Sequence, residues 1–147
     1  MNKEYYEEEI RKILPKFKNV KFVHNGRSLD EGLDCLGFLV LFYKEFGINI
    51  PSDDGKPIER DWYKKDPERY IRAIRNFCSN EVKINELQPL DLVYFAVKRN
   101  IITHTGVMIN DREFAHMAPR KGLLISRLNR PWRRRFRGAV RLIDKKL

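Results

Sequence analysis

The sequence predicts an α+β fold, a single domain over residues 1–147 with N-terminal helices packed on a C-terminal antiparallel sheet of about five strands. Up to residue 80, apolar side chains recur at helical spacing, whereas from residue 85 short β-rich runs are separated by turn residues. No internal repeat, low-complexity tract or linker divides the chain, which indicates one compact unit.

Three segments are predicted to be helical. Residues 3–14 have an amphipathic pattern, and residues 35–46 carry apolar side chains at helical spacing, with Gly47 as a suitable stop. A third helix over residues 66–80 begins at Asp66, which precedes a proline as N-caps often do. Its buried side is expected to carry Tyr70, Ile71, Ile74, Phe77 and Cys78.

The second half of the chain has the composition of strands. Val, Ile, Tyr and Phe gather in short runs bounded by Gly, Pro, Asn and Asp, as in antiparallel sheets with tight turns. The predicted strands are residues 91–97, 103–109, 113–117, 123–128 and 137–143.

Composition limits the environment and the partners. With 42% hydrophobic residues the chain has enough apolar surface to fold, and no apolar run reaches the roughly 20 residues needed for membrane insertion. The N-terminus lacks the pattern of a secretory signal, so we expect cytoplasmic synthesis and free thiols. The net charge of +10 favours anionic partners such as nucleic acid, anionic wall polymers or an acidic surface, without choosing among them.

Cys35 is the candidate nucleophile. It stands where a polar loop turns into the predicted helix over residues 35–46, and the positive end of a helix dipole favours thiolate over thiol. Asp34 before it is a suitable N-cap. One such cysteine with well-separated histidines is the sequence outline of a thiol hydrolase.

His104 and His116 are the candidate partners of Cys35. They are 12 residues apart, which fits one hairpin. A three-residue turn at 110–112 would place His116 opposite Gly106 and both histidines on one face, with Gly106 leaving open space between them; a two-residue turn would separate them. His104 would then act as base, forming a thiolate–imidazolium pair with Cys35, and His116 would orient its ring.

These segments also resemble a known family. Residues 32–39 are similar to the Asp-Cys-Ser-Gly motif of NlpC-type peptidases, a bacterial and phage branch of the papain-like fold. The resemblance implies a thiol-dependent amidase or endopeptidase that cleaves peptidoglycan stem peptides, with Cys35, His104 and His116 as its triad and no metal or cofactor. Because the N-terminus lacks a secretory signal pattern, such an enzyme is expected to act in a phage particle or after release by lysis. Further segments resemble, in order, the family's helix exit and its strands: residues 47–51, 87–95, 104–109, 114–116 and 136–141.

The chain departs from the family pattern at several positions. The family's serine after the cysteine is Leu36, its glycine before the strand aspartate is Leu90, and an upstream tyrosine aligns with Phe22. Of the family's substrate-recognition positions, here Phe22, Asp34 and Leu36, only Asp34 keeps its polar group. An alternative function is therefore a related thiol acyl hydrolase or acyltransferase on another acyl substrate.

Non-enzymatic alternatives remain open. The arginine-rich residues 130–137, which include Trp132, suit an inactive phage or wall-binding module, whereas nucleic acid binding is less favoured because the segment leads into a strand. Zinc ligation by Cys35, Cys78, His104 and His116 is disfavoured because no two of these are closely spaced.

Overall fold

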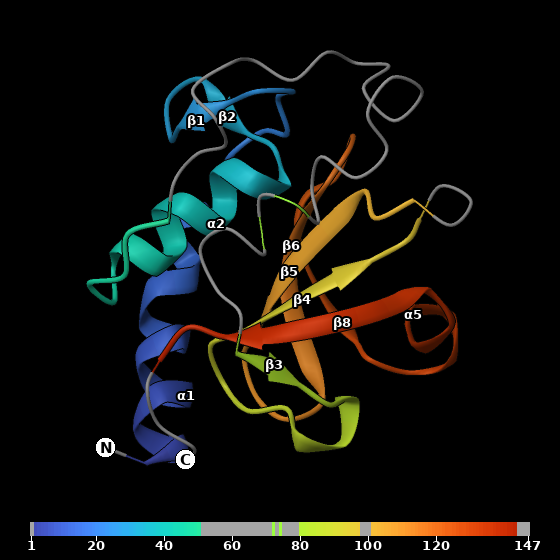
Figure 1. The fold of residues 1–147 in the computed structure, drawn as a ribbon. Coiled ribbons are helices and arrows are strands. Elements are labelled where there is room, and N and C mark those ends of the chain that lie inside the picture. Colours follow the sequence, from blue (N-terminus) through green and yellow to red (C-terminus); the bar gives the residue numbers. More distant parts are fainter. Residues whose placement is uncertain (1, 51–71, 73, 75–79, 98–100, 144–147) are drawn as a thin grey trace.

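The structure is a computed structural model that describes residues 2–50, 72, 74, 80–97 and 101–143. Two helices lie on one side of an antiparallel sheet, and a short helix lies on the other side (Figure 1). The predicted α+β architecture is therefore confirmed. Among the described helices, none combines the length and the apolar character required to cross a membrane.

The two N-terminal helices form where the sequence predicts them. Helix α1 (Lys3–Ile13) begins at Asn2, whose side chain accepts a hydrogen bond from the Tyr5 N–H, and it continues into the 3-10 helix η1 (Leu14–Phe17). Helix α2 (Cys35–Lys44) is two residues shorter than predicted. Of the third predicted helix only Arg72, Ile74 and Asn80 are described: Arg72 and Ile74 are helical, Ile74 is buried, and Asn80 is not helical. Cys78 lies outside the described residues.

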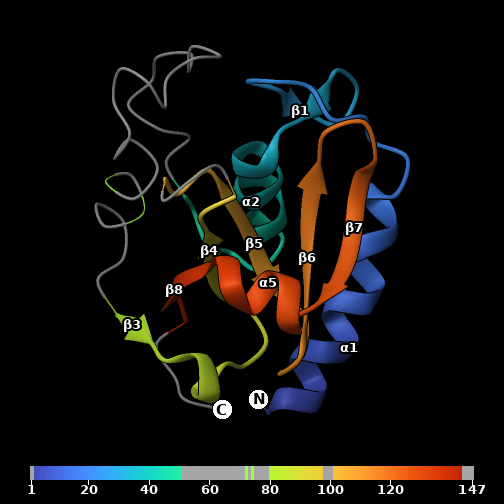
Figure 2. The same ribbon diagram turned by 90° about the vertical axis from the view of Figure 1, so that its right-hand side faces the viewer.

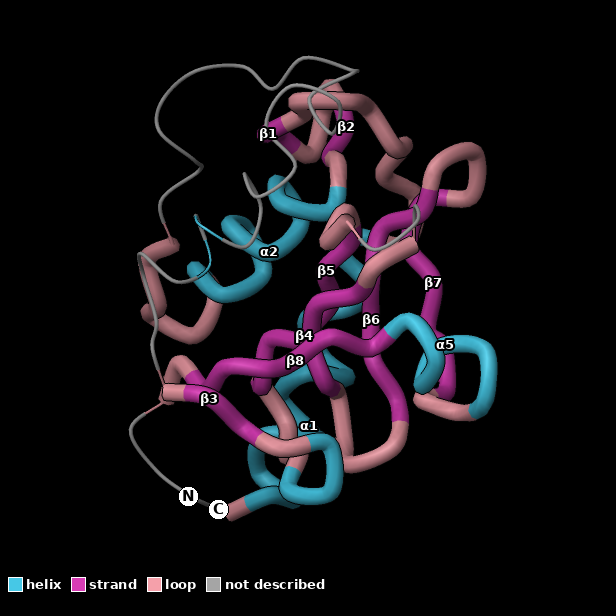
Figure 3. The backbone as a smooth tube through the Cα atoms, turned by 45° about the vertical axis from the view of Figure 1, so that its right-hand side comes forward, coloured by secondary structure: helices cyan, strands magenta, loops and turns pink. Residues whose placement is uncertain are grey.

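The sheet has six strands in the order β3-β8-β4-β5-β6-β7 (Figure 3). A separate two-stranded hairpin, β1 (Arg27–Ser28) with β2 (Gly32–Leu33), leads into α2. The extra strand β3 was not predicted because two residues carry no period-two pattern. The strands of the large sheet are β3 (Glu81–Val82), β4 (Asp91–Phe95), β5 (His104–Met108), β6 (Glu113–Ala118), β7 (Gly122–Arg127) and β8 (Phe136–Arg141), with the 3-10 helix η2 (Ile84–Glu86) between β3 and β4.

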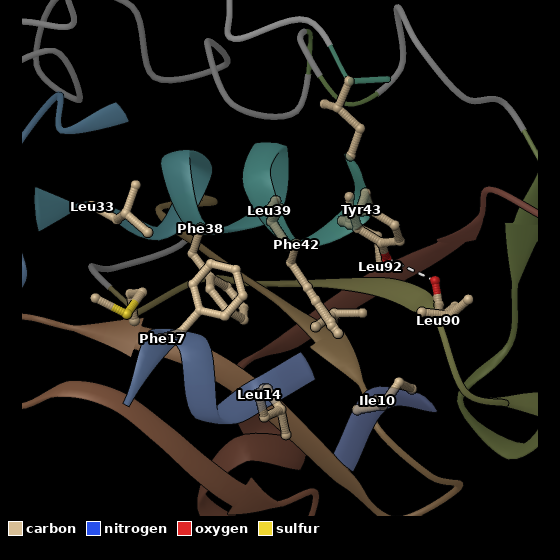
Figure 4. Close-up of a cluster of buried hydrophobic side chains, with 14 of the residues drawn as sticks. Ile10, Leu14, Phe17, Leu33, Phe38, Leu39, Phe42, Tyr43, Leu90 and Leu92 are labelled. Atoms are coloured by element: carbon tan, nitrogen blue, oxygen red, sulfur yellow. Dashed lines mark hydrogen bonds between the residues drawn. The ribbon is translucent and has the colours of Figure 1, made fainter. Parts of the chain in front are cut away.

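Helix α2 packs its apolar side on one face of the sheet. Phe38, Phe42 and Tyr43 are fully buried there, together with Leu92 and residues of η1 (Figure 4). The Tyr43 hydroxyl donates a hydrogen bond of 2.7 Å to the carbonyl of Leu90. This bond fixes the C-terminal half of α2 against the start of β4.

The opposite face of the sheet is covered by helix α5 (Arg130–Arg135), seen in front of the strands in Figure 2. Trp132 of α5 packs on a second buried cluster that includes Val93, Phe95 and Phe114. The sequence did not predict this helix, because its Arg-rich residues show no apolar periodicity.

Candidate active site

Cys35 is the first residue of α2 and is buried. The helix starts here because Asp34 caps it: its Oδ1 accepts hydrogen bonds of 2.8 Å from the Gly37 N–H and from Arg27 Nη1. Its Oδ2 accepts from the Asn25 N–H at 2.9 Å. The expected capping role is thus confirmed, and both carboxylate oxygens of Asp34 are already engaged within the protein.

The thiol end of α2 lies against the segment that enters β5. Cys35 and Leu36 form a small buried cluster on which Ile101 and Ile102 pack, two to three residues before His104. Helix α2 also contacts both β5 and β6. The fold therefore brings the Cys35 segment and the His104 segment to the same end of the sheet.

His104 and His116 are adjacent, as the sequence predicts. The Nε2 of His104 lies 2.7 Å from the Nδ1 of His116. The strands pair with Met108 opposite Phe114, and the Ile109 N–H bonds the Glu113 carbonyl, so the turn is the three-residue one on which the predicted triad depends. This pairing is what places both imidazoles on one face.

The space between the histidines is not open, contrary to expectation. A Cβ atom at Gly106 would lie 2.9 Å from the Ala115 carbonyl oxygen and 2.9 Å from the Phe114 ring. Glycine is required at this position because β6 and the Phe114 side chain fill the space that a larger residue needs.

A further residue extends the histidine pair. The Nε2 of His116 lies 2.8 Å from the Oγ of Ser126 on β7. If His104 Nε2–H donates to His116 Nδ1 and His116 Nε2–H donates to Ser126 Oγ, the Nδ1 of His104 is left without a proton and can accept one. If both hydrogen bonds run in the opposite direction, the Nδ1 of a neutral His104 carries the proton. Ser126 was missed because a single serine in a strand carries no local signal of its partner.

Trp132 covers the two imidazoles. Its ring stacks on that of His104, with centroids 5.6 Å apart, and meets His116 edge-on at 5.0 Å. Phe95 and Phe114 complete the aromatic surroundings. The sequence predicts Trp132 as part of a basic binding segment, whereas its ring is part of the histidine environment.

This environment favours neutral imidazoles. Burial, with the nearby charges of His116 and Arg135, lowers the pKa of His104 to about 3. Burial also lowers the pKa of His116 to about 4. The expected thiolate–imidazolium pair requires a charged His104. Burying that charge is unfavourable, so a thiolate would have to lie close to the ring to offset the cost of burial.

The histidines and the body of α2 occupy different faces of the sheet. His104 pairs with Phe95, on the side that α5 covers, whereas Phe38 and Tyr43 of α2 pack on the other side. A contact between the Cys35 thiol and the His104 ring must therefore be made around the end of the sheet, where α2 begins and β5 starts.

The remaining predicted positions are apolar and packed. Phe22 forms a bridge with Leu33 and packs on the core, and Leu36 is buried beside Cys35. Among the described residues, no three His, Cys, Asp or Glu side chains are grouped so as to hold a metal ion. Cys78, one of the residues weighed as a zinc ligand, lies outside this part of the chain.

Helices on an antiparallel sheet, a cysteine at a helix N-terminus and a histidine pair on two neighbouring strands define the papain-like class. Within that class the chain belongs to the NlpC/P60 family, whose sequence profile matches residues 19–141. The recognition made from the short motifs is confirmed.

Two kinds of relatives support this assignment. The murein DD-endopeptidase MepS/murein LD-carboxypeptidase of Escherichia coli is 27% identical, a match covering 82% of this chain and 55% of that protein. An NlpC/P60 family protein from Bacillus cereus has a TM-score of 0.67 at 25% identity, covering 92% of this chain and 40% of its own. The NlpC/P60 domain of the peptidoglycan hydrolase SagA shares the fold with a TM-score of 0.61 at 15% identity, covering 95% of this chain and 98% of that domain.

The chain spans about half the length of the curated relatives that it matches. Those relatives are named as peptidases, including a probable endopeptidase NlpC homolog of Haemophilus influenzae. At the level of the family, the predicted class of cysteine peptidase, a hydrolase, is therefore confirmed.

Proposed function

We propose that this chain hydrolyses amide bonds of peptidoglycan stem peptides through Cys35, His104 and His116. The observation that carries the proposal is the bonded series His104–His116–Ser126, which fixes the orientation of the His104 ring. The segment that enters His104 packs on Cys35 and Leu36 at the start of α2. Family membership and the peptidase names of the relatives support the same reaction. No cofactor enters the proposal.

The proposed chemistry uses a neutral imidazole as general base. The Nδ1 of His104 takes the thiol proton of Cys35 as the sulfur attacks the scissile carbonyl, so the ring becomes positive only as the intermediate forms. Backbone N–H groups at the start of α2 stabilise the oxyanion. His104 then protonates the leaving amine, and water hydrolyses the acyl-Cys35 by the same proton transfers in reverse.

His116, Ser126 and Trp132 act through His104. His116 holds the ring by its Nδ1, and Ser126 keeps the proton of His116 on Nε2 by accepting it in a hydrogen bond. Trp132 shields both rings from water, which strengthens hydrogen bonds between them. These three are positioning residues, since the transferred proton moves only between Cys35, His104 and the substrate.

A second candidate is a thiol acyl hydrolase or acyltransferase acting on another acyl group. The observation that favours it is the apolar character of Leu36, which is buried, and of Phe22, which is partly buried against the core, beside an Asp34 whose oxygens are already bonded. Such a surface offers few hydrogen bonds to the polar end of a stem peptide.

The test is digestion of purified muropeptides, with products identified by mass spectrometry, by the wild-type chain and by Cys35→Ala. The proposal expects cleavage by the wild-type chain only, with both proteins equally folded by circular dichroism. Cleavage by Cys35→Ala would overturn it. An acyl adduct on Cys35 formed only from non-peptide donors would favour the second candidate.

A non-catalytic role as a phage or wall-binding module makes a different prediction. An inactive module would show no selective alkylation of Cys35 by iodoacetamide at neutral pH, since its thiol would not be activated. Selective alkylation of Cys35, abolished by a His104→Ala change, would support catalysis over this role.

A further inference from the structure

A pocket of about 400 Å³ lies outside the residues assigned to catalysis. Residues 18–22, which follow η1, form one wall, and residues 120–122, at the end of the turn between β6 and β7 and the start of β7, form the other. In Figure 2 this turn lies at the end of the molecule that holds β1 and the start of α2.

The backbone places the two walls close together. The Lys21 carbonyl accepts a hydrogen bond of 3.0 Å from the Leu33 N–H, which ties the first wall to β2. In the second wall Arg120 has a φ of +69°, and a Cβ at Gly122 would lie 2.9 Å from the Val20 carbonyl oxygen. A left-handed arginine costs on the order of 1 kcal/mol, so the tight turn is maintained against strain.

The pocket is strongly positive. It is lined by Lys18, Lys21, Arg120 and Lys121, all exposed, and by no acidic residue. Within the described chain none of these four cations forms an ion pair, whereas Lys16, Arg27 and Arg141 each have an acidic partner. Four like charges facing one hollow repel one another, and a bound anion would relieve that repulsion.

The position of the pocket connects it with the candidate active site. Phe22 in its wall bridges to Leu33, two residues before Cys35, and Arg120 follows His116 by four residues. At about 3.3 Å per extended residue and about 4.8 Å between bridged strands, these links keep the pocket within roughly 11–13 Å of the backbone at Cys35 and His116. A peptide bound at Cys35 reaches this distance within about four residues.

We propose that this pocket binds a carboxylate of an acidic peptide substrate, a few residues away from the bond that is cleaved. The inference rests on the proposed function, whose stem-peptide substrate carries free carboxylates. The cations would select peptides by charge at a distance from the thiol, whereas the apolar Leu36 beside Cys35 and Phe22 in the pocket wall contribute no ionic contact.

The test measures binding without turnover, in the full chain carrying Cys35→Ala. The probe is a fluorescent muropeptide with free carboxylates, compared with the same muropeptide in which they are methylamides. The pocket variant adds Lys21→Ala and Lys121→Ala. The matched control adds Arg133→Ala and Arg134→Ala, which remove the same charge from exposed positions on α5.

The pocket variant is expected to bind the acidic muropeptide about fivefold more weakly, since each exposed charge pair contributes a few tenths to 1 kcal/mol. The control should change binding less than twofold, and the methylamide should bind all three proteins equally weakly. Equal losses in both variants, or equal affinity for acid and methylamide, would overturn the inference.

Two further arms separate this inference from its alternatives. If a glycerol phosphate polymer occupies the pocket and the acidic muropeptide does not displace it, the assignment to a peptide carboxylate fails. Turnover by the wild-type chain is measured separately. Binding that depends on the pocket, without turnover, would support the pocket inference and contradict only the proposed function. Turnover at the same rate for the acidic muropeptide and its methylamide would contradict only the pocket inference.

Discussion

The Nε2 of His104 lies 2.7 Å from the Nδ1 of His116, so one nitrogen of the proposed base is committed before any substrate binds. The other nitrogen alone is left for Cys35. Which of the two carries the proton depends on the direction of the hydrogen bond at the far end of the pair, between His116 and Ser126.

Ser126→Ala is predicted to lower kcat about tenfold, because a lost hydrogen bond of about 1–1.5 kcal/mol leaves His116 free to adopt the wrong tautomer. Ser126→Thr keeps the hydroxyl and should retain most activity. The measurement is kcat and KM for muropeptide cleavage from pH 5 to 9. A Ser126→Ala variant within twofold of the wild type at every pH would contradict this role.

The stability of the fold should fall as the pH is lowered from about 6.5 toward 4. The folded state holds His104 and His116 with pKa values of about 3 and about 4, below the ordinary 6.5. Between pH 6.5 and these lower pKa values the unfolded chain binds protons at the two histidines that the folded chain does not bind. Lowering the pH therefore reduces the free energy of unfolding, by up to several kcal/mol.

Urea unfolding at pH 7.5, 6.5 and 5.5 tests this dependence, in a range above the titration of most carboxylates. The double variant His104→Gln, His116→Gln removes both groups and should flatten the curve, whatever its stability at pH 7.5. An unchanged slope in the double variant would assign the pH dependence to other residues.

Trp132→Ala is predicted to raise the pKa of His104 toward 6.5, because it removes the ring that stacks on that imidazole and admits water. Its unfolding free energy should fall by about 2–4 kcal/mol through lost aromatic packing. Trp132→Phe keeps an apolar ring and should lie between the wild type and Trp132→Ala. Titration of the histidine ring protons by NMR measures the shift, and an unchanged pKa in Trp132→Ala would contradict the shielding role.

Asp34→Ala is predicted to destabilise the chain by about 2 kcal/mol or more. It removes the cap of α2 and leaves Arg27, a half-buried cation, without its carboxylate. Asp34→Asn keeps one acceptor oxygen for the Gly37 N–H, so its thermal midpoint should fall between those of the wild type and Asp34→Ala. Equal midpoints for the two variants would show that the cap contributes little.

Strand geometry limits the histidine register to two outcomes because side chains alternate at every residue, and the three-residue turn at 110–112 is the one that brings the imidazoles together. The helix start could be predicted because Asp34 precedes an apolar periodic segment. These are local signals, and the structure confirms both.

Other parts of the site depend on distant contacts that no local pattern carries. Ser126 contacts His116 because β7 pairs with β6, and Trp132 contacts both histidines because α5 packs on their face of the sheet. Gly106 was read as open space, since its sequence neighbours do not reveal that Phe114 fills the site from β6.

Leu90 shows how a departure from a family pattern is accommodated. It has a φ of +74°, the left-handed region in which glycine is favoured, and it occupies the position of the family's glycine. Its side chain is fully buried, and burial of a leucine contributes roughly 1.5–3 kcal/mol, enough to offset the conformational cost.

The hydrogen bond from Tyr43 to the Leu90 carbonyl holds α2 at the end opposite to its thiol. Eight residues separate Tyr43 from Cys35, a lever arm of about 12 Å at 1.5 Å per residue. A tilt of about 5° at this pivot would carry the sulfur about 1 Å sideways, a displacement that typically costs about a hundredfold in rate. The position of the Cys35 sulfur thus depends on a hydrogen bond at the other end of α2. Removing the Tyr43 hydroxyl would lower the proposed activity without changing any group that contacts substrate.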